Sequence, residues 1–185
     1  MSNVPQQVRP GDWFCVDTGS AAAKLIRVGE WLNGDGFHDY EHAAIVTGVD
    51  PLTIVEAKPS GAAEVPYHYE GRNIIWSTGL VEPPDREAVV AAARRCIGTP
   101  YSFLDYLALA LHRLHIPAPG LRTYIASTRH MICSQLVDRC ELQGGMHLFA
   151  DGRWPGYVTP AALADLLLSI RARKLAMAPD PSTMG

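Results

Sequence analysis

Short apolar segments, separated by turn residues, occupy most of the first half of the chain and predict β-strands. A turn at Pro10-Gly11-Asp12 leads into the first of them, and Asp50-Pro51 separates the second from the third. The second and third segments are therefore expected to form a β-hairpin. The predicted strands cover residues 13–16, 40–49, 52–57 and 73–77, and residues 65–70 are expected to be extended but polar.

Longer segments with apolar residues at helical spacing dominate the second half. Proline and aspartate at 84 and 85 suit the first turn of a helix, and Ser102 suits an N-cap. The predicted helices span residues 21–31, 85–96, 103–115, 132–142 and 160–175. Because strands come mainly first and helices afterwards, the expected fold is α+β, with an antiparallel sheet packed against helices.

The length of 185 residues is enough for one domain with a good core. We expect an N-terminal arm at residues 1–9, a single domain at 10–176 and a flexible C-terminal tail at 177–185. The content of 48% hydrophobic and 19% charged residues is typical of a globular chain. The net charge of −3, without a long basic run, argues against nucleic acid as a partner.

The N-terminal residues are polar and contain no apolar signal region, and the longest apolar run, 106–111, is too short to span a bilayer. These features predict a chain made in the cytoplasm without a transmembrane segment. Export would then need another route, such as cell lysis or packing into a larger particle like a virion.

The chain has four cysteines without a CxxC pair or zinc-site spacing, so we expect free thiols. Cys133 precedes Ser134 and an amphipathic run, which predicts a thiol on the first turn of a helix. Backbone N–H groups and the helix dipole favour a thiolate there. Cys15 is expected in the core. Cys96 and Cys140 come late in their helices, where the dipole disfavours a thiolate.

A cysteine nucleophile needs a base and a group that orients the base. His42 begins a predicted strand, whereas His38 lies in a Gly-rich loop and is less well held. Glu56 ends the next strand, so the hairpin brings it to the same open end as His42. A one-residue slip in register would move Glu56 to the other face. A cysteine, histidine or glutamate at such a position is more often structural than catalytic. The spacing of the three residues alone therefore leaves both a hydrolase site and a purely structural role open.

Four short motifs resemble those of NlpC-type cell-wall peptidases. Cys133-Ser134-Gln135-Leu136-Val137 resembles the nucleophile motif Cys-Ser-x-Leu-Val, and Gly98-Thr99-Pro100-Tyr101 resembles Gly-x-Pro-Tyr. Pro10-Gly11-Asp12 and His42-Ala43-Ala44-Ile45-Val46 resemble the Pro-Gly-Asp turn and the histidine strand of the same superfamily. The resemblance covers roughly residues 10–142.

The order of the motifs is similar to the circularly permuted branch of this superfamily, because the cysteine comes last. The resemblance implies a permuted papain-like fold with Cys133 as the nucleophile, His42 as the base and Glu56 as the orienting residue. The resemblance implies that Tyr101 lines the site near the oxyanion. The alternative is a core tyrosine that packs against the start of a helix. Ser134 is implied to supply a backbone N–H to the oxyanion.

These observations predict a thiol hydrolase, a peptidase or amidase, that needs no metal or organic cofactor. The resemblance implies a peptide of the peptidoglycan type as substrate and a phage or bacterial cell-wall enzyme. One alternative is a lipid-directed acyltransferase or thioesterase of the same fold, with residues 106–114 as an apolar entrance. Another is a catalytically inactive binding module of a virion or other assembly.

Overall fold

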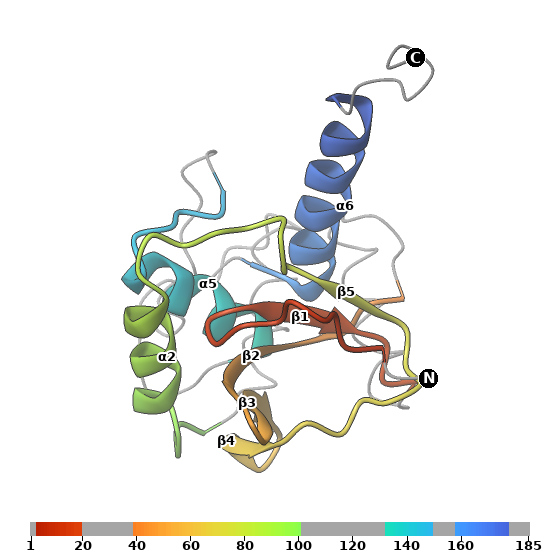
Figure 1. Cartoon of the computed structure of the whole chain (residues 1–185). Helices are drawn as coiled ribbons and strands as arrows, with labels where there is room; N and C mark the ends of the chain where they lie inside the picture. The colour runs from red at the N-terminus through yellow and green to blue at the C-terminus, as the bar shows by residue number, and fades with distance from the viewer. Residues whose placement is uncertain (1–2, 20–38, 101–131, 150–157, 178–185) are drawn as a thin grey trace, which may run out of the picture.

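The computed structural model describes residues 3–19, 39–100, 132–149 and 158–177. Within them the chain is α+β, with a five-stranded antiparallel sheet packed against helices, as the sequence predicted (Figure 1). The sheet has the strand order β4-β3-β2-β1-β5. The elements are β1 (Trp13–Val16), β2 (His42–Val49), β3 (Leu52–Lys58), β4 (Gly61–Pro66), β5 (Ile74–Trp76), α2 (Arg86–Arg95), α5 (Cys133–Gln143) and α6 (Pro160–Met177).

Most of these elements lie within two residues of their predicted bounds, because each has its own local pattern. β4 is the exception, since it begins at Gly61 rather than near residue 65. Gly61 has φ +106°, and a Cβ there would lie 3.2 Å from the backbone oxygen of Thr99. The glycine therefore lets the chain reverse directly into the strand. The helices predicted at 21–31 and 103–115 lie outside the described residues.

The hairpin of β2 and β3 contains an irregular pair of residues. Gly48 faces Thr53, but the next pair along the ladder is Val46 with Ile54. Thr47 is thus an extra residue on β2, which is the definition of a β-bulge. On the side of the bulge away from the turn, Ala44, Ile45 and Val46 each face a β3 residue one position away from the partner that they would have in a regular hairpin.

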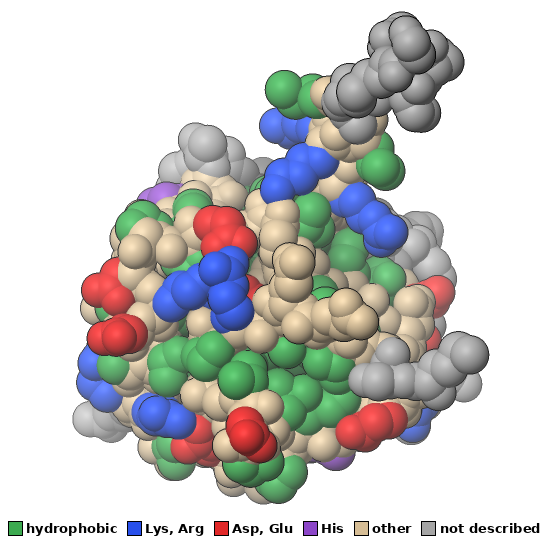
Figure 2. Space-filling model, in the orientation of Figure 1, with side chains coloured by type: hydrophobic (Ala, Val, Ile, Leu, Met, Phe, Trp, Pro, Cys, Tyr) green, Lys and Arg blue, Asp and Glu red, His purple; other side chains and the backbone are tan. Residues whose placement is uncertain are grey.

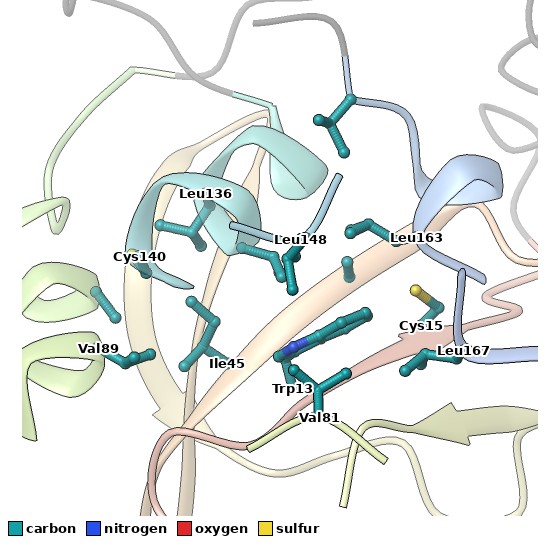
Figure 3. Close-up of a cluster of buried hydrophobic side chains, with 14 of the residues drawn as sticks. Trp13, Cys15, Ile45, Val81, Val89, Leu136, Cys140, Leu148, Leu163 and Leu167 are labelled. Atoms are coloured by element: carbon teal, nitrogen blue, oxygen red, sulfur yellow. The ribbon is translucent and has the colours of Figure 1, made fainter. Parts of the chain in front are cut away.

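The three helices that the structure describes, α2, α5 and α6, pack on one face of the sheet. Trp13 and Ile45, both fully buried, point from β1 and β2 into a core that receives Leu136 from α5 and Leu163 from α6 (Figure 3). Val89 supplies the contribution of α2. Burial of a large apolar side chain is worth about 1.5–3 kcal/mol, so this core is the main force that holds α5 against the sheet.

Residues of the predicted N-terminal arm cover part of the other face. Val4 and Val8 pack against a cluster that includes Phe14 and Trp76. The backbone oxygen of Asn3 accepts a hydrogen bond of 2.9 Å from Nε1 of Trp76. The described part of the arm is therefore packed on the sheet.

The Pro10-Gly11-Asp12 turn precedes β1, and the Asp12 side chain binds the start of α2. The carboxylate of Asp12 accepts hydrogen bonds from Nη1 of Arg86 at 2.7 Å and from the hydroxyl of Thr78 at 2.8 Å. It also accepts one from the backbone N–H of Arg9 at 2.9 Å. Asp12 is 1% exposed, so these donors replace the water that the carboxylate loses. In this fold the motif is a structural clamp.

The second half of α6 extends beyond the sheet and the other helices (Figure 1). Figure 2 shows Lys and Arg side chains along this part, which contains Arg171, Arg173 and Lys174. Nζ of Lys174 donates a hydrogen bond to the backbone oxygen of Gly79. Among the described residues, no helix is both long enough and apolar enough to cross a membrane.

Candidate active site

Cys133 is the first residue of α5, as the sequence predicted. The preceding residue, Ile132, has extended backbone angles, and its N–H donates to Oε1 of Gln135 at 3.2 Å. The backbone oxygen of Ile132 accepts from the N–H of Leu136 at 3.0 Å and so begins the helix. The Cys133 thiol therefore stands where the N–H groups and the positive end of the helix dipole stabilise negative charge.

Ser134 fixes this helix start to the chain that leads into α6. It is fully buried, and its hydroxyl donates a hydrogen bond of 2.7 Å to the backbone oxygen of Val158. The side chain is thus structural. Its backbone N–H lies on the first turn of α5, where N–H groups have no partner within the helix. Its contribution to an oxyanion site stays a prediction.

His42 and Glu56 lie side by side on neighbouring strands. Nε2 of His42, on the first residue of β2, is 2.9 Å from Oε2 of Glu56 on β3. The exposed fractions of the two side chains are 11% and 2%, so the pair lies largely out of water. The carboxylate occupies Nε2, which leaves Nδ1 of the imidazole for another partner.

Cys133 is a second partner of His42, because its side chain forms a hydrogen bond with the imidazole. Burial is the largest single influence and disfavours the imidazolium, but the negative charge of the Cys133 thiolate, the hydrogen bonds to Cys133 and Glu56 and the charge of Glu56 oppose it. Together they raise the pKa of His42 to about 9. Residues from β2, β3 and α5 thus form one chain of contacts, thiol to imidazole to carboxylate.

Glu56 has further partners that the sequence did not predict. The hydroxyl of Tyr69 donates to Oε2 at 2.5 Å, and Nζ of Lys58 lies 2.6 Å from Oε1. Nε2 of His68 is 3.6 Å from the same Oε1. Burial raises the pKa of the carboxyl, but hydrogen bonds from His42, Lys58 and Tyr69 overcome it and lower the pKa to about 2.

Tyr69 is the most informative of these missed residues. Its ring is part of the apolar cluster on the second face of the sheet, and burial, followed by its bond to Glu56, raises the pKa of its hydroxyl. The signal in the sequence was the spacing of Tyr67 and Tyr69, since residues two apart in an extended segment face the same side. The polarity of residues 65–70 concealed this pattern.

The remaining sequence predictions for the site have different outcomes. Tyr101 and His38 lie outside the described residues. Within the described parts of the chain, no group of three or more His, Cys, Asp or Glu side chains is arranged to hold a metal ion. Cys15, expected in the core, is fully buried.

Comparison with known proteins gives a likeness in fold. The sequence matches no protein-family model, and no curated protein matches it. A solved structure described as metalloprotein yiiX from Escherichia coli O157:H7, DUF1105, superposes with a TM-score of 0.51. The match covers 86% of this chain and 80% of that chain at 17% sequence identity. At this identity the likeness concerns the fold alone.

Proposed function

We propose that the protein is a cysteine hydrolase, a peptidase or amidase, with Cys133 as nucleophile, His42 as base and Glu56 as the residue that orients the base. The observation that supports the proposal most strongly is the chain of side-chain contacts from Cys133 through His42 to Glu56, with the thiol on the first turn of a helix. A thiolate beside an imidazolium is the reactive state of such a pair.

The reaction follows from these positions. The sulfur of Cys133 attacks the carbonyl carbon of an amide, and protonated His42 gives its proton to the leaving amine as the C–N bond breaks. Water then attacks the thioester carbonyl and gives a proton to His42; the C–S bond breaks, the acid leaves, and the Cys133 thiolate and protonated His42 are restored. Glu56 holds Nε2 throughout, so the imidazole keeps one orientation and its cationic form is stabilised.

The substrate class rests on the motif resemblance to permuted NlpC-type enzymes, which implies a stem peptide of the peptidoglycan type. The contacts among Cys133, His42 and Glu56 support the type of chemistry, and the resemblance supports the substrate class. Hydrolysis of defined stem peptides, compared with hydrolysis of lipid esters and thioesters, separates the amidase from the lipid-directed alternative. The proposed apolar entrance of that alternative, residues 106–114, lies outside the described residues.

The decisive experiment measures iodoacetamide labelling of each cysteine against pH, with the labelled peptides identified by mass spectrometry. We expect Cys133 to label rapidly below the ~8.5 at which a free thiol titrates, and His42→Ala to abolish this rapid labelling. Site identification is essential because Cys96 is half-buried and its pKa is lowered to about 7, so it will also react. The Cys96→Ser variant is the matched control and should leave labelling of Cys133 unchanged.

One observation favours a binding module instead. Cys133 is 1% exposed, and a buried thiol is ordinarily inert. Slow labelling of Cys133 at every pH, unchanged in His42→Ala, together with no turnover of amides, esters or thioesters, would establish that alternative and overturn the hydrolase.

A metal requirement is a separate question, since the structurally similar protein is described as a metalloprotein. The proposed steps use only the thiol, the imidazole and water. We therefore expect hydrolysis to survive dialysis against EDTA without loss. A loss that Zn²⁺ or another divalent ion restores would contradict the thiol mechanism.

A further inference from the structure

Two cysteines outside the proposed site lie against each other. Cys96 is the C-cap of α2, and Cys140 lies on α5, where it is 1% exposed. Their side chains are hydrogen-bonded. Cys96 packs against the core cluster that contains Cys140, and Figure 3 shows Cys140 on the side of α5 that faces Val89 of α2. Both thiols are free.

The surroundings of the two sulfurs differ in a way that gives them different chemistry. The hydrogen bond from Cys140 lowers the pKa of Cys96 to about 7 against the opposing effect of burial, and the charges of Arg139 and Arg95 assist. The same hydrogen bond, together with burial, raises the pKa of Cys140. The raised pKa of Cys140 is in the direction expected for a thiol late in a helix, whereas the lowered pKa of Cys96 is opposite to that expectation. At Cys96 the neighbouring thiol and the two arginines dominate.

We propose that Cys96 and Cys140 are an oxidisable dithiol pair, in which hydrogen peroxide oxidises half-buried Cys96 and buried Cys140 resolves the product into a disulfide between α2 and α5. The reactive thiolate needs access to a small oxidant, and Cys96 has partial exposure. The resolving thiol needs contact with the oxidised sulfur but no access to solvent, and buried Cys140 is in contact with Cys96. This division of roles is typical of redox-sensing cysteines.

The chemistry balances in two steps. The Cys96 thiolate attacks one oxygen of hydrogen peroxide, so that an S–O bond forms, the O–O bond breaks and hydroxide leaves, which takes up the proton that the Cys96 thiol had released to solvent. The sulfur of Cys140 then attacks the sulfenic sulfur of Cys96, the S–S bond forms, and the S–O bond breaks to release water with the Cys140 proton. In total, two thiols are oxidised and one peroxide is reduced to two waters.

The disulfide would join the end of α2 to the helix that begins with Cys133. It would also close the chain between residues 96 and 140 into a loop, which constrains the unfolded protein more than the folded one. We therefore expect the oxidised protein to melt at a higher temperature than the reduced protein. Dithiothreitol should reverse the shift.

The test treats the folded full chain with increasing hydrogen peroxide, alkylates the remaining thiols and maps the peptides by mass spectrometry. We expect a Cys96–Cys140 cross-linked peptide in the wild-type protein, and in Cys133→Ser a fall in free thiols from three to one, with Cys15 the thiol that is still alkylated after denaturation. The cross-link should form equally in Cys133→Ser, which separates this pair from the proposed active site.

Two variants test the division of roles. In Cys140→Ala the oxidised Cys96 has no resolving partner, so it should accumulate as a sulfenic acid that dimedone labels. In Cys96→Ser, Cys140 should stay reduced at the same peroxide doses. The proposal is overturned if wild-type protein shows no Cys96–Cys140 cross-link at doses that oxidise Cys133. A Cys96 disulfide to Cys133 or to a second molecule, in place of Cys140, overturns it as well.

Discussion

Glu56 faces Ala44 across β2 and β3, although a regular hairpin from the same turn would pair it with Ile45. The difference is the extra residue at Thr47. Alternate residues of a strand face opposite sides of the sheet, so Ala44 shares its side with His42 and Ile45 does not. The bulge therefore places the carboxylate of Glu56 on the same side as the imidazole, where the 2.9 Å contact forms.

The first prediction concerns the bulge. A Cβ on Gly48 would lie 2.6 Å from Oγ1 of Thr53, which is too close for any undisturbed structure. We expect Gly48→Ala to lower the free energy of unfolding by about 1–3 kcal/mol, measured by urea denaturation. The matched control is Gly48→Ala in a Thr53→Ala background, where the clashing oxygen is absent. An equal cost in both backgrounds would show that this contact is not the cause.

The second prediction concerns the orienting carboxylate. Glu56→Gln removes the charge that stabilises protonated His42 while it keeps the shape of the side chain. We expect a fall of at least about tenfold in kcat/KM for amide hydrolysis, since general acid–base catalysis contributes about 10²–10⁴. Tyr69→Phe removes only one hydrogen bond to Oε2 and should have a smaller effect. A larger loss for Tyr69→Phe than for Glu56→Gln would reverse the proposed roles.

The third prediction concerns the thiolate–imidazolium pair. Because the Cys133 thiolate is the strongest influence that opposes desolvation of His42, Cys133→Ala should lower the pKa of His42 from about 9. NMR titration of the His42 ring in both proteins measures the shift. Tyr67→Phe, which leaves the pair untouched, serves as the control. An unchanged titration in Cys133→Ala would mean that the thiol does not act on the imidazole.

The same pKa values set the pH range in which the pair stabilises the fold. The folded pKa of His42 is above its unfolded value of about 6.5, so its contribution is complete below pH ~6.5 and is lost as pH rises through about 9. The folded pKa of Glu56 is below its usual value, so its contribution is present above pH ~4.5 and is lost as pH falls toward about 2.

The fourth prediction concerns Glu141, a fully buried acid on α5 whose two carboxylate oxygens have no hydrogen-bond partner among the described residues. Burial raises its pKa to about 8, although Arg86 opposes the rise and Asp12 and Asp138 assist it. The folded protein therefore holds a proton that the unfolded chain has lost above pH ~4.5. We expect this residue to reduce stability by on the order of 1 kcal/mol per pH unit from pH ~5 to ~8.

In Glu141→Gln the side chain at position 141 does not titrate, so the folded and unfolded states no longer differ in proton binding there. Chemical denaturation at several pH values should show a flatter dependence in the variant than in wild type between pH ~5 and ~8. The control is Glu87→Gln on α2, because Glu87 is not among the charged residues that shift the pKa of Glu141. Parallel curves for wild type and Glu141→Gln would contradict a raised pKa for Glu141.

Local patterns in the sequence were sufficient to predict the α+β class, most strands and helices, and the position of Cys133 at a helix start. Each of these depends on residues that are neighbours in the chain, such as the apolar run at 13–16 or Asp85, whose carboxylate accepts the N–H of Ala88 at the start of α2. The hairpin also indicated that His42 and Glu56 lie near the same open end.

Three features depended on the tertiary structure. The bulge at Thr47 selected which face Glu56 occupies, because packing on both sides of the sheet decides between registers that differ by one residue. The bond from Tyr69 to Glu56 depends on a segment that returns over the sheet after β4. The contact of Cys96 with Cys140 depends on the packing of two helices that are distant in sequence. Sequence determines the elements through short-range periodicity, whereas side-chain partners from different elements are fixed only when those elements bury a common core.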